Sequence, residues 1–274
     1  MSEAFAGVRR IEEIRAVADS GGISAGVEID RLHAAFADIP LRPLGFPVHA
    51  YIEPHIEQHV LLEEAGKTIG IVTGIQGKKT FEIEISGEKG HAGTLAMSDR
   101  RDAVAAFARI AAMLHDKVGG DDPDVKFTIG RVEVYPNAPS VVPHAVRFRV
   151  DLRHPDNDAL ERGGRLIRSI CEDLAKPCRA KVTTLVSASS NDFDERLRAM
   201  IAAAAEHYGF PAMPVLSYAG HDARQMARLC RSAMIFIPCR DGISHDESEW
   251  IEPEHAAAGA QVLCAVIAEL AAGA

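Results

Sequence analysis

The 274-residue sequence predicts an α/β protein that carries a second, α+β module inserted within it. Residues 78–188 alternate strand-like and helix-like segments in the order βαββαβ, which can enclose a core of its own. The residues on both sides combine helical periodicity with short apolar runs. One of these, AMIFIP at 233–238, is typical of a buried parallel strand. The predicted domains are therefore 1–77 together with 189–274, and the inserted 78–188.

The first flank begins with helical periodicity over 5–38, interrupted at Gly21-Gly22. Prolines then favour an extended approach to a strand at 49–57. In that strand Glu53, His55 and Glu57 alternate with apolar neighbours, as expected of a half-buried strand. Three titratable groups on one strand face are unusual for a surface that only meets water. A helical turn at 61–64 and a strand at 68–73 complete this flank.

The inserted module and the second flank follow the same local rules. In the module, alternation predicts strands at 80–86, 126–135, 145–152 and 181–187, and helical spacing predicts helices at 99–115 and 158–174. This order is that of a ferredoxin-like sandwich. In the second flank we expect helices at 194–207, 222–229 and 255–272, and strands at 214–218 and 233–238.

Composition excludes several classes of protein. A net charge of -9 and a pI near 5.7 argue against nucleic acid or an anionic membrane as the partner. We recognise no apolar run of the ~20 residues that a bilayer span needs, and no signal-peptide core at the N-terminus. The five cysteines form no C-x-x-C pair, which disfavours a disulfide framework or a thiolate zinc site. We expect a soluble cytoplasmic protein.

Two polar clusters in the second flank resemble the one around His55. SYAGHDA at 217–223 presents His221 and Asp222 after a short strand, and DGISHDESE at 241–249 presents His245 beyond the apolar strand. Ligands in open α/β sheets lie beyond the carboxyl ends of the strands. Imidazoles and carboxylates gathered there suit a borderline divalent metal such as zinc. The alternative for each histidine alone is a solvated or hydrogen-bonded loop residue.

The inserted module has polar clusters of its own. GEKGHAGT at 87–94 presents His91 beyond a strand, and YPNAPSVVP at 135–143 forms a proline-bracketed loop. Arg153, in DLRHPD at a strand end, can hold a carboxylate in bidentate fashion. A surface salt bridge is the alternative for Arg153.

Seven motifs together resemble one family. HIEQ, LLEEAGKTIGIVTGIQG, GHAGTLAMSDRRDA, PNAPSVVP, DLRHPD, AGHDA and GISHDESE are similar, in order and spacing, to the hydantoinase/carbamoylase family of zinc amidohydrolases. That family includes N-carbamoyl-L-amino acid hydrolases, allantoate amidohydrolases and ureidopropionases, and is related to dinuclear zinc exopeptidases. The resemblance implies a zinc-exopeptidase-like catalytic domain in the flanks and a dimerisation or lid domain at 78–188. It also implies a homodimer that hydrolyses linear amide or ureido C–N bonds of small carboxylate substrates. The implied metal is zinc, and manganese or cobalt are the alternatives.

The resemblance also implies roles for individual residues. His55 and His245 would be metal ligands, and Glu57 a structural neighbour of the site. The remaining positions would be catalytic (His91) or substrate-binding (Gln58, His91, Asn137, Ser140, Arg153, His221 and Asp222). Ser140 stands where the family has a second asparagine.

The family's His-x-Asp ligand pair, bridging aspartate and Glu-Glu pair have no counterpart before His55. The chain is therefore expected to be a truncated member, equivalent to the C-terminal two thirds. Two imidazoles without a bridging carboxylate predict at most one metal ion per chain, and hydrolysis close to background. The alternative is a catalytically incompetent remnant that acts as a dimeric small-molecule-binding protein, or that needs a separate N-terminal half. The exact substrate stays open.

Overall fold

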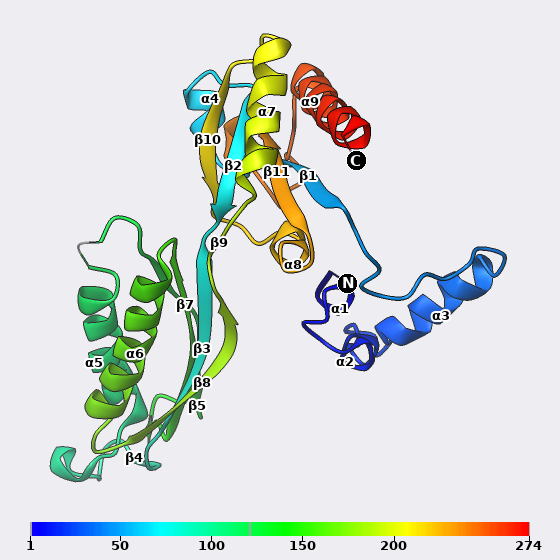
Figure 1. The fold of residues 1–274 in the computed structure, drawn as a ribbon. Coiled ribbons are helices and arrows are strands. Elements are labelled where there is room, and N and C mark those ends of the chain that lie inside the picture. Colours follow the sequence, from blue (N-terminus) through cyan, green and yellow to red (C-terminus); the bar gives the residue numbers. More distant parts are fainter. Residues whose placement is uncertain (1, 121, 274) are drawn as a thin grey trace. The chain divides into compact units, whose positions relative to one another are not determined.

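The computed structural model describes residues 2–120 and 122–273, which form two compact units. The flanking unit consists of the chain up to Ile75 and from Asn191 onward, and the inserted unit is Gln76–Ser190. Figure 1 shows the elements of each unit along the chain. The predicted class, an α/β protein with an inserted α+β module, is confirmed.

The flanking unit is built on one mixed sheet. Its order is β1-β11-β2-β10, and the short strand β9 is paired to β2. β1 runs parallel to β11, β10 runs parallel to β2, and β11 meets β2 in antiparallel fashion. The strands are β1 (Ala50–Ile56), β2 (Ile69–Ile75), β9 (Asn191–Asp192), β10 (Ala212–Ser217) and β11 (Arg231–Ile237).

Two hydrophobic cores lie on opposite faces of this sheet, because successive side chains of a strand point to opposite sides. Ala233 and Ile235 of β11 pack with α7 (Glu195–His207) and α9 (Pro253–Ala272). Met234 and Phe236 pack on the other face, which carries α4 (Leu61–Glu64) and α8 (Ala223–Met226). The central position of β11 explains why its run of residues is apolar without interruption.

Helix α9 differs from what we expected of the sequence. By length and composition it is the one helix among residues 2–120 and 122–273 that could cross a membrane, although we recognised no such run. In the fold it covers the sheet, and Ala258, Val262 and Val266 are buried in the core. Its apolar character therefore has a structural reason in this unit.

The N-terminal segment is less helical than its periodicity predicts. Helices α1 (Ser2–Phe5), α2 (Ile11–Arg15) and α3 (Ala25–Ala35) are separate. Between α2 and α3 the Asp19 carboxylate accepts the N–H groups of Gly21 and Ile23, and Gly22 has a φ of +83°. This Asx-type turn lies at the predicted interruption, Gly21-Gly22. The helix predicted on either side of it is wrong over residues 6–10 and 16–20, and α3 ends at Ala35 and not at 38.

The inserted unit is a ferredoxin-like sandwich. Its antiparallel sheet has the order β5-β7-β3-β8, with α5 and α6 on one face around a core that includes Phe81, Ile110, Phe148 and Ile167. Its elements are β3 (Gly77–Ser86), β4 (Gly90–His91), η1 (Met97–Asp99), α5 (Ala103–Lys117), β5 (Lys126–Tyr135), β6 (Val141–Val142), β7 (Ala145–His154), α6 (Asn157–Leu174) and β8 (Arg179–Ala188).

Candidate metal centre and substrate site

Strand β1 presents its polar residues on one face of the flanking sheet. Ile52 and Ile56 point into the core beneath α7 and α9. Tyr51, Glu53 and His55 alternate with them and therefore lie on the opposite face. The alternation seen in the sequence is thus the alternation of side chains across the sheet. It places a carboxylate and an imidazole two residues apart on one surface.

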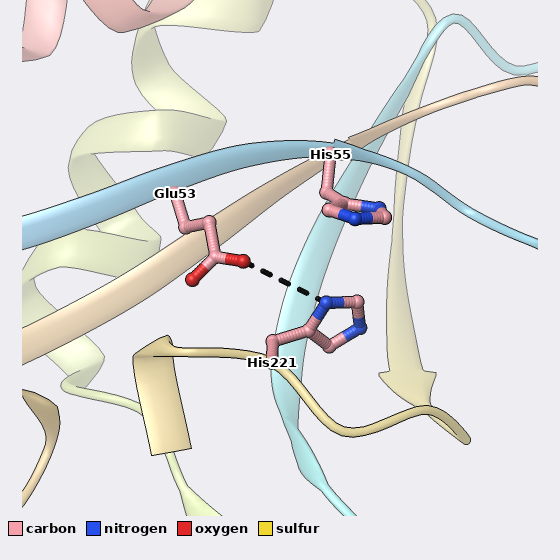
Figure 2. A group of neighbouring side chains, drawn as sticks. All are labelled: Glu53, His55 and His221. Carbon is pink, nitrogen blue, oxygen red and sulfur yellow. Dashed lines mark ion pairs between the residues drawn. The ribbon is translucent and has the colours of Figure 1, made fainter. Parts of the chain in front are cut away.

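Glu53 and His55 converge with His221, which follows β10 in the chain (Figure 2). Each residue can offer one ligand atom to a metal ion, and the three atoms lie within 4.8 Å of one another. His221 Nδ1 lies 3.6 Å from Glu53 Oε1. The rings of His55 and His221 meet edge to face, with centroids 4.6 Å apart. The side chains of His221 and Glu53 are only 2% and 15% exposed, so solvent is largely excluded from this contact.

The hydrogen bonds of His221 leave one ring nitrogen without a proton. The Ser217 hydroxyl donates to the Ala219 carbonyl at 3.2 Å, so we assign the 2.9 Å contact between His221 Nε2 and Ser217 Oγ to an Nε2–H donor. Burial, then the neighbouring charges of His55 and Arg224, lower the pKa of His221 to about 4. The imidazole is therefore neutral near pH 7. Its Nδ1 lone pair faces a carboxylate.

The second carboxylate oxygen of Glu53, Oε2, accepts two hydrogen bonds that fix the side chain. Oε2 accepts the backbone N–H of Ala223 at 2.8 Å and the hydroxyl of Tyr51 at 3.2 Å. Burial, and then the negative charge of Glu53, raise the pKa of Tyr51, so this hydroxyl stays a donor. These two bonds fix the carboxylate and leave Oε1 directed towards His221.

The three residues fit a zinc-type ion. Two imidazoles and a carboxylate are a donor set that zinc takes in proteins. His55 Nδ1 lies 2.8 Å from the carbonyl of Ile56, which assigns the ring proton to Nδ1 and leaves the Nε2 lone pair for a metal. A divalent cation would also remove the repulsion between the two acceptors, His221 Nδ1 and Glu53 Oε1.

The structure places the second predicted metal ligand, His245, outside this group of three. His245, His55 and Gln58 instead line one cavity of about 890 Å³. Gln58 Nε2 donates to Ser244 Oγ at 2.6 Å and lies 3.5 Å from His245 Nε2. Gln58 and His245 both have a φ of +60°. Such left-handed non-glycine residues are strained and tend to gather at functional sites.

Glu57 and Asp222 have partners of their own. Glu57 is 7% exposed, and its Oε2 accepts the backbone N–H of Leu62 at the start of α4. Burial raises the pKa of Glu57, and the hydrogen bond from the N–H of Leu62 offsets only part of this effect. Asp222 precedes α8, and its Oδ1 accepts the hydroxyl of Ser2 at 2.6 Å.

In the inserted unit, three predicted site residues gather at one end of the sheet. His91 lies in β4, which is paired to β6, and the N–H of Ala92 donates to the carbonyl of Ser140 at 3.0 Å. Asn137 belongs to the same loop and has a φ of +55°. We call His91, Asn137 and Ser140 the tip residues.

Arg153 lies at the opposite end of that sheet. In the β3–β7 pair, Ala145 is opposite Ser86 near the tip, whereas Arg153 is opposite Lys78. Eight residues of strand separate the two positions, about 26 Å at the usual rise. Arg153 Nε donates to Asp151 Oδ1 at 2.7 Å, so its guanidinium is oriented by a carboxylate. The inserted unit of one chain therefore does not bring Arg153 and the tip residues together.

Glu53, Tyr51 and Ser217 of the site are not among the residues that the sequence motifs predict. The alternation in β1 pointed to Glu53, but nothing local showed that its partner was His221. We assigned His221 to the substrate. Its contact with His55 and Glu53 adds it to the candidate ligands.

The profile of peptidase family M20/M25/M40 matches residues 10–269. The chain is 36% identical to the N-carbamoyl-L-amino-acid amidohydrolase of Rhizobium meliloti, over 98% of this chain and 65% of that protein. It is 35% identical to the allantoate amidohydrolase of Bacillus subtilis (strain 168), over 82% of this chain and 55% of that protein.

A solved structure gives the same likeness. The crystal structure of a hydantoinase/carbamoylase family amidase from Burkholderia vietnamiensis matches with a TM-score of 0.83 and 35% identity, covering 97% of this chain and 64% of that one. The chain thus spans less than two thirds of the length of each of these three relatives. The resemblance that the motifs indicated is confirmed.

Proposed function

The chain belongs to peptidase family M20/M25/M40, and from this premise we propose that it is a metal-dependent hydrolase of linear amide or ureido C–N bonds. Its substrates are small carboxylates of the N-carbamoyl amino acid or allantoate type, as the names of its relatives suggest. The observation that carries the proposal is the convergence of Glu53, His55 and His221, with His55 also lining the cavity of Gln58 and His245. The working form is a cytoplasmic homodimer.

Glu53, His55 and His221 hold the ion in this proposal, and His245 is a further candidate ligand from the same cavity. A zinc-type ion held there would polarise the substrate carbonyl and lower the pKa of a water molecule bound to it. Ser217 fixes the tautomer of His221, because it accepts the Nε2 proton. Tyr51 and the N–H of Ala223 hold the Glu53 carboxylate in its orientation.

The remaining residues bind and orient the substrate. Gln58 offers its amide to polar groups in the cavity, and Arg153 binds the substrate carboxylate. His91 donates a hydrogen bond to the carbonyl oxygen as charge develops on it. The ~26 Å of strand between Ala145, near the tip residues, and Arg153 exceeds the size of such a substrate. The tip residues of one protomer therefore serve the site of its partner, which is the reason for proposing a homodimer.

Metal analysis and turnover together test the proposal. Protein purified without chelator is analysed for zinc, manganese and cobalt, and is then assayed with each added ion on N-carbamoyl-L-amino acids and allantoate. We expect at least one ion per chain and metal-dependent turnover. Both should be lost in His55→Ala and retained in His207→Ala, which removes an exposed histidine of α7. Metal-loaded protein without turnover would contradict the proposal and support our sequence-based expectation of near-background hydrolysis.

A further inference from the structure

The chain after β1 lies against the chain after β11 at the edge of the cavity. β1 and β11 are parallel neighbours, and Ile56 is opposite Ile237 at their carboxyl ends. Gly242, beyond β11, has a φ of +66°, and a Cβ atom there would lie 2.9 Å from the carbonyl carbon of His59. Glycine is needed at this position, because its backbone tolerates the positive φ and leaves room for the neighbouring turn.

This contact holds the amide of Gln58 from its nitrogen end. Nε2 donates to Ser244 Oγ at 2.6 Å and lies 3.5 Å from His245 Nε2. His245 Nε2 must keep a lone pair if it is to bind an ion, so an amide NH2 group suits this side and an amide oxygen would be repelled. The side-chain nitrogen of Gln58 is therefore directed to Ser244 and His245, and the side-chain oxygen, Oε1, is at the other end of the amide.

Oε1 of Gln58 is an acceptor that the fold leaves unused. Gln58 and Ser244 both line the cavity of about 890 Å³. Within residues 2–120 and 122–273 the hydrogen bonds of the Gln58 side chain involve Nε2 and not Oε1. A fixed acceptor at the wall of a cavity strengthens the binding of a ligand that brings an N–H donor. That bond is lost when a methyl group takes the place of the donor.

We propose that Ser244 is a positioning residue that orients the Gln58 amide, so that Gln58 Oε1 accepts a hydrogen bond from the terminal NH2 group of a ureido substrate. This inference rests on the proposed function, in which the cavity takes the substrate. An N-carbamoyl compound ends in an NH2 group, whereas an N-acetyl compound of nearly the same shape ends in a methyl group. The site therefore prefers ureido substrates to simple N-acyl amino acids. Without the Ser244 hydroxyl the amide can turn over and present either end, and the preference is lost.

Binding of two matched probes tests this orientation without turnover. The full chain, treated with a chelator, is titrated calorimetrically with N-carbamoyl-L-alanine and with N-acetyl-L-alanine. We expect the carbamoyl compound to bind about fivefold more tightly, since the two probes differ by one hydrogen bond to the protein. Equal binding of the two probes, or no measurable binding of either, would overturn the proposal.

Three serine variants separate orientation from stability. The ratio of the two affinities should fall towards unity in Ser244→Ala and return in Ser244→Thr, which restores a hydroxyl. It should persist in Ser248→Ala, which removes an exposed hydroxyl bonded to Asp246 in the same loop. A purely structural role of Ser244 would weaken both probes alike and leave the ratio unchanged. A ratio unchanged in Ser244→Ala would therefore overturn the proposal.

Turnover provides the second measurement. The metal-loaded protein is assayed on the same two compounds, both of which are linear amides. A higher kcat/KM for the carbamoyl compound, reduced in Ser244→Ala mainly through KM, supports the role of Ser244. A preference for the acetyl compound counts against it. If neither compound is hydrolysed, the hydrolase proposal fails, and the ratio of the two affinities still decides whether Ser244 and Gln58 select the ureido group.

Discussion

His221 donates a hydrogen bond from one ring nitrogen. The lone pair of its other ring nitrogen lies near a carboxylate oxygen of Glu53. Nε2 lies 2.9 Å from Ser217 Oγ, and Nδ1 lies 3.6 Å from Glu53 Oε1. Two acceptors this close repel each other, and a proton or a cation between them would remove the repulsion. Burial lowers the pKa of the imidazole to about 4, which disfavours the proton at neutral pH. The surroundings of His221 therefore favour a metal cation over a proton at this position.

Replacing Glu53 by glutamine should separate metal binding from folding. A glutamine amide can donate to His221 Nδ1, so we expect the apo protein to keep its unfolding midpoint. The ion loses a charged ligand, and zinc affinity should fall by about tenfold to a hundredfold. Competition with a chelating dye measures the affinity, and Glu254→Gln, an exposed change in the first turn of α9, is the control. An unchanged zinc affinity would show that Glu53 does not bind the ion.

Asp151 should make stability depend on pH. Burial alone would raise the pKa of its carboxyl, but Lys78 and then Arg153 outweigh burial, and the pKa is lowered. A carboxylate with a depressed pKa stabilises the fold above its unfolded pKa of about 3.9, and this contribution is lost as the pH falls through the folded value. Asp151→Asn should therefore lower the free energy of unfolding by roughly 1 kcal/mol at pH 7, and by less near pH 3. Urea unfolding at both pH values measures this, and an equal loss at both would contradict it.

Among the elements, α9 has a sequence pattern that is compatible both with a membrane-spanning helix and with a helix that covers a sheet. Its length and apolar composition would suit a membrane, yet its position over the flanking sheet buries Ala258, Val262 and Val266. The outward side keeps exposed apolar residues such as Ile267, which is 51% exposed. Because β11 is buried on both faces, α9 supplies one of the two layers that such a strand needs. The apolar stripe of α9 is therefore part of the fold.

Two truncations on α9 test this assignment. Val262 is fully buried, and Val262→Ala should lower the free energy of unfolding by about 2 kcal/mol through lost burial and the remaining cavity. Ile267→Ala removes a larger but half-exposed side chain and should cost less than Val262→Ala. Chemical denaturation of the two variants gives both values. Equal losses, or a larger loss for Ile267→Ala, would mean that α9 buries a different face.

For the molecule as a whole, the inserted unit limits which of the predicted site residues of one chain can contact the same substrate molecule. The tip residues and Arg153 lie at opposite ends of one antiparallel sheet, in which about 26 Å of strand separate Ala145 from Arg153. A small carboxylate substrate cannot contact both ends of one unit. If both groups act on one substrate, a second copy must supply one of them. A symmetric dimer then forms two equivalent sites, each with residues from both chains.

Mixing inactive variants tests the shared site. His91→Ala and Arg153→Ala should each be nearly inactive as homodimers. After unfolding and refolding together, a heterodimer holds one site with both residues intact, so the mixture should regain about a quarter of the parent activity. His91→Ala mixed with Asn137→Ala is the control, since each of its sites lacks one tip residue. Failure of the first mixture to regain activity, while the parent refolds well, would place both groups in the site of one chain.

Local patterns were enough for much of the fold. Alternation located β1 and the long strands of the inserted unit, and a continuous apolar run located β11. Helical spacing located α5, α6, α7 and α9, because these signals arise between residues at most a few positions apart. The helical prediction over 5–38 failed at residues 6–10, between α1 and α2. The predicted interruption at Gly21-Gly22 lies in the turn where the Asp19 side chain bonds to the backbone. The motifs identified the family, and they named His55, His91 and Arg153 as candidates without showing which of them lie together.

The arrangement of the candidate centre required the folded chain. The sequence placed a carboxylate and an imidazole on one strand face, since that follows from the two-residue period of a strand. Only the packing of the loop after β10 against β1 brings His221 to Glu53, through a bond from Ala223 to a residue 170 positions earlier. The neutral state of His221 depends on burial and on His55 from another strand. Such neighbours are set by long-range packing and pairing, which no local period in the sequence encodes.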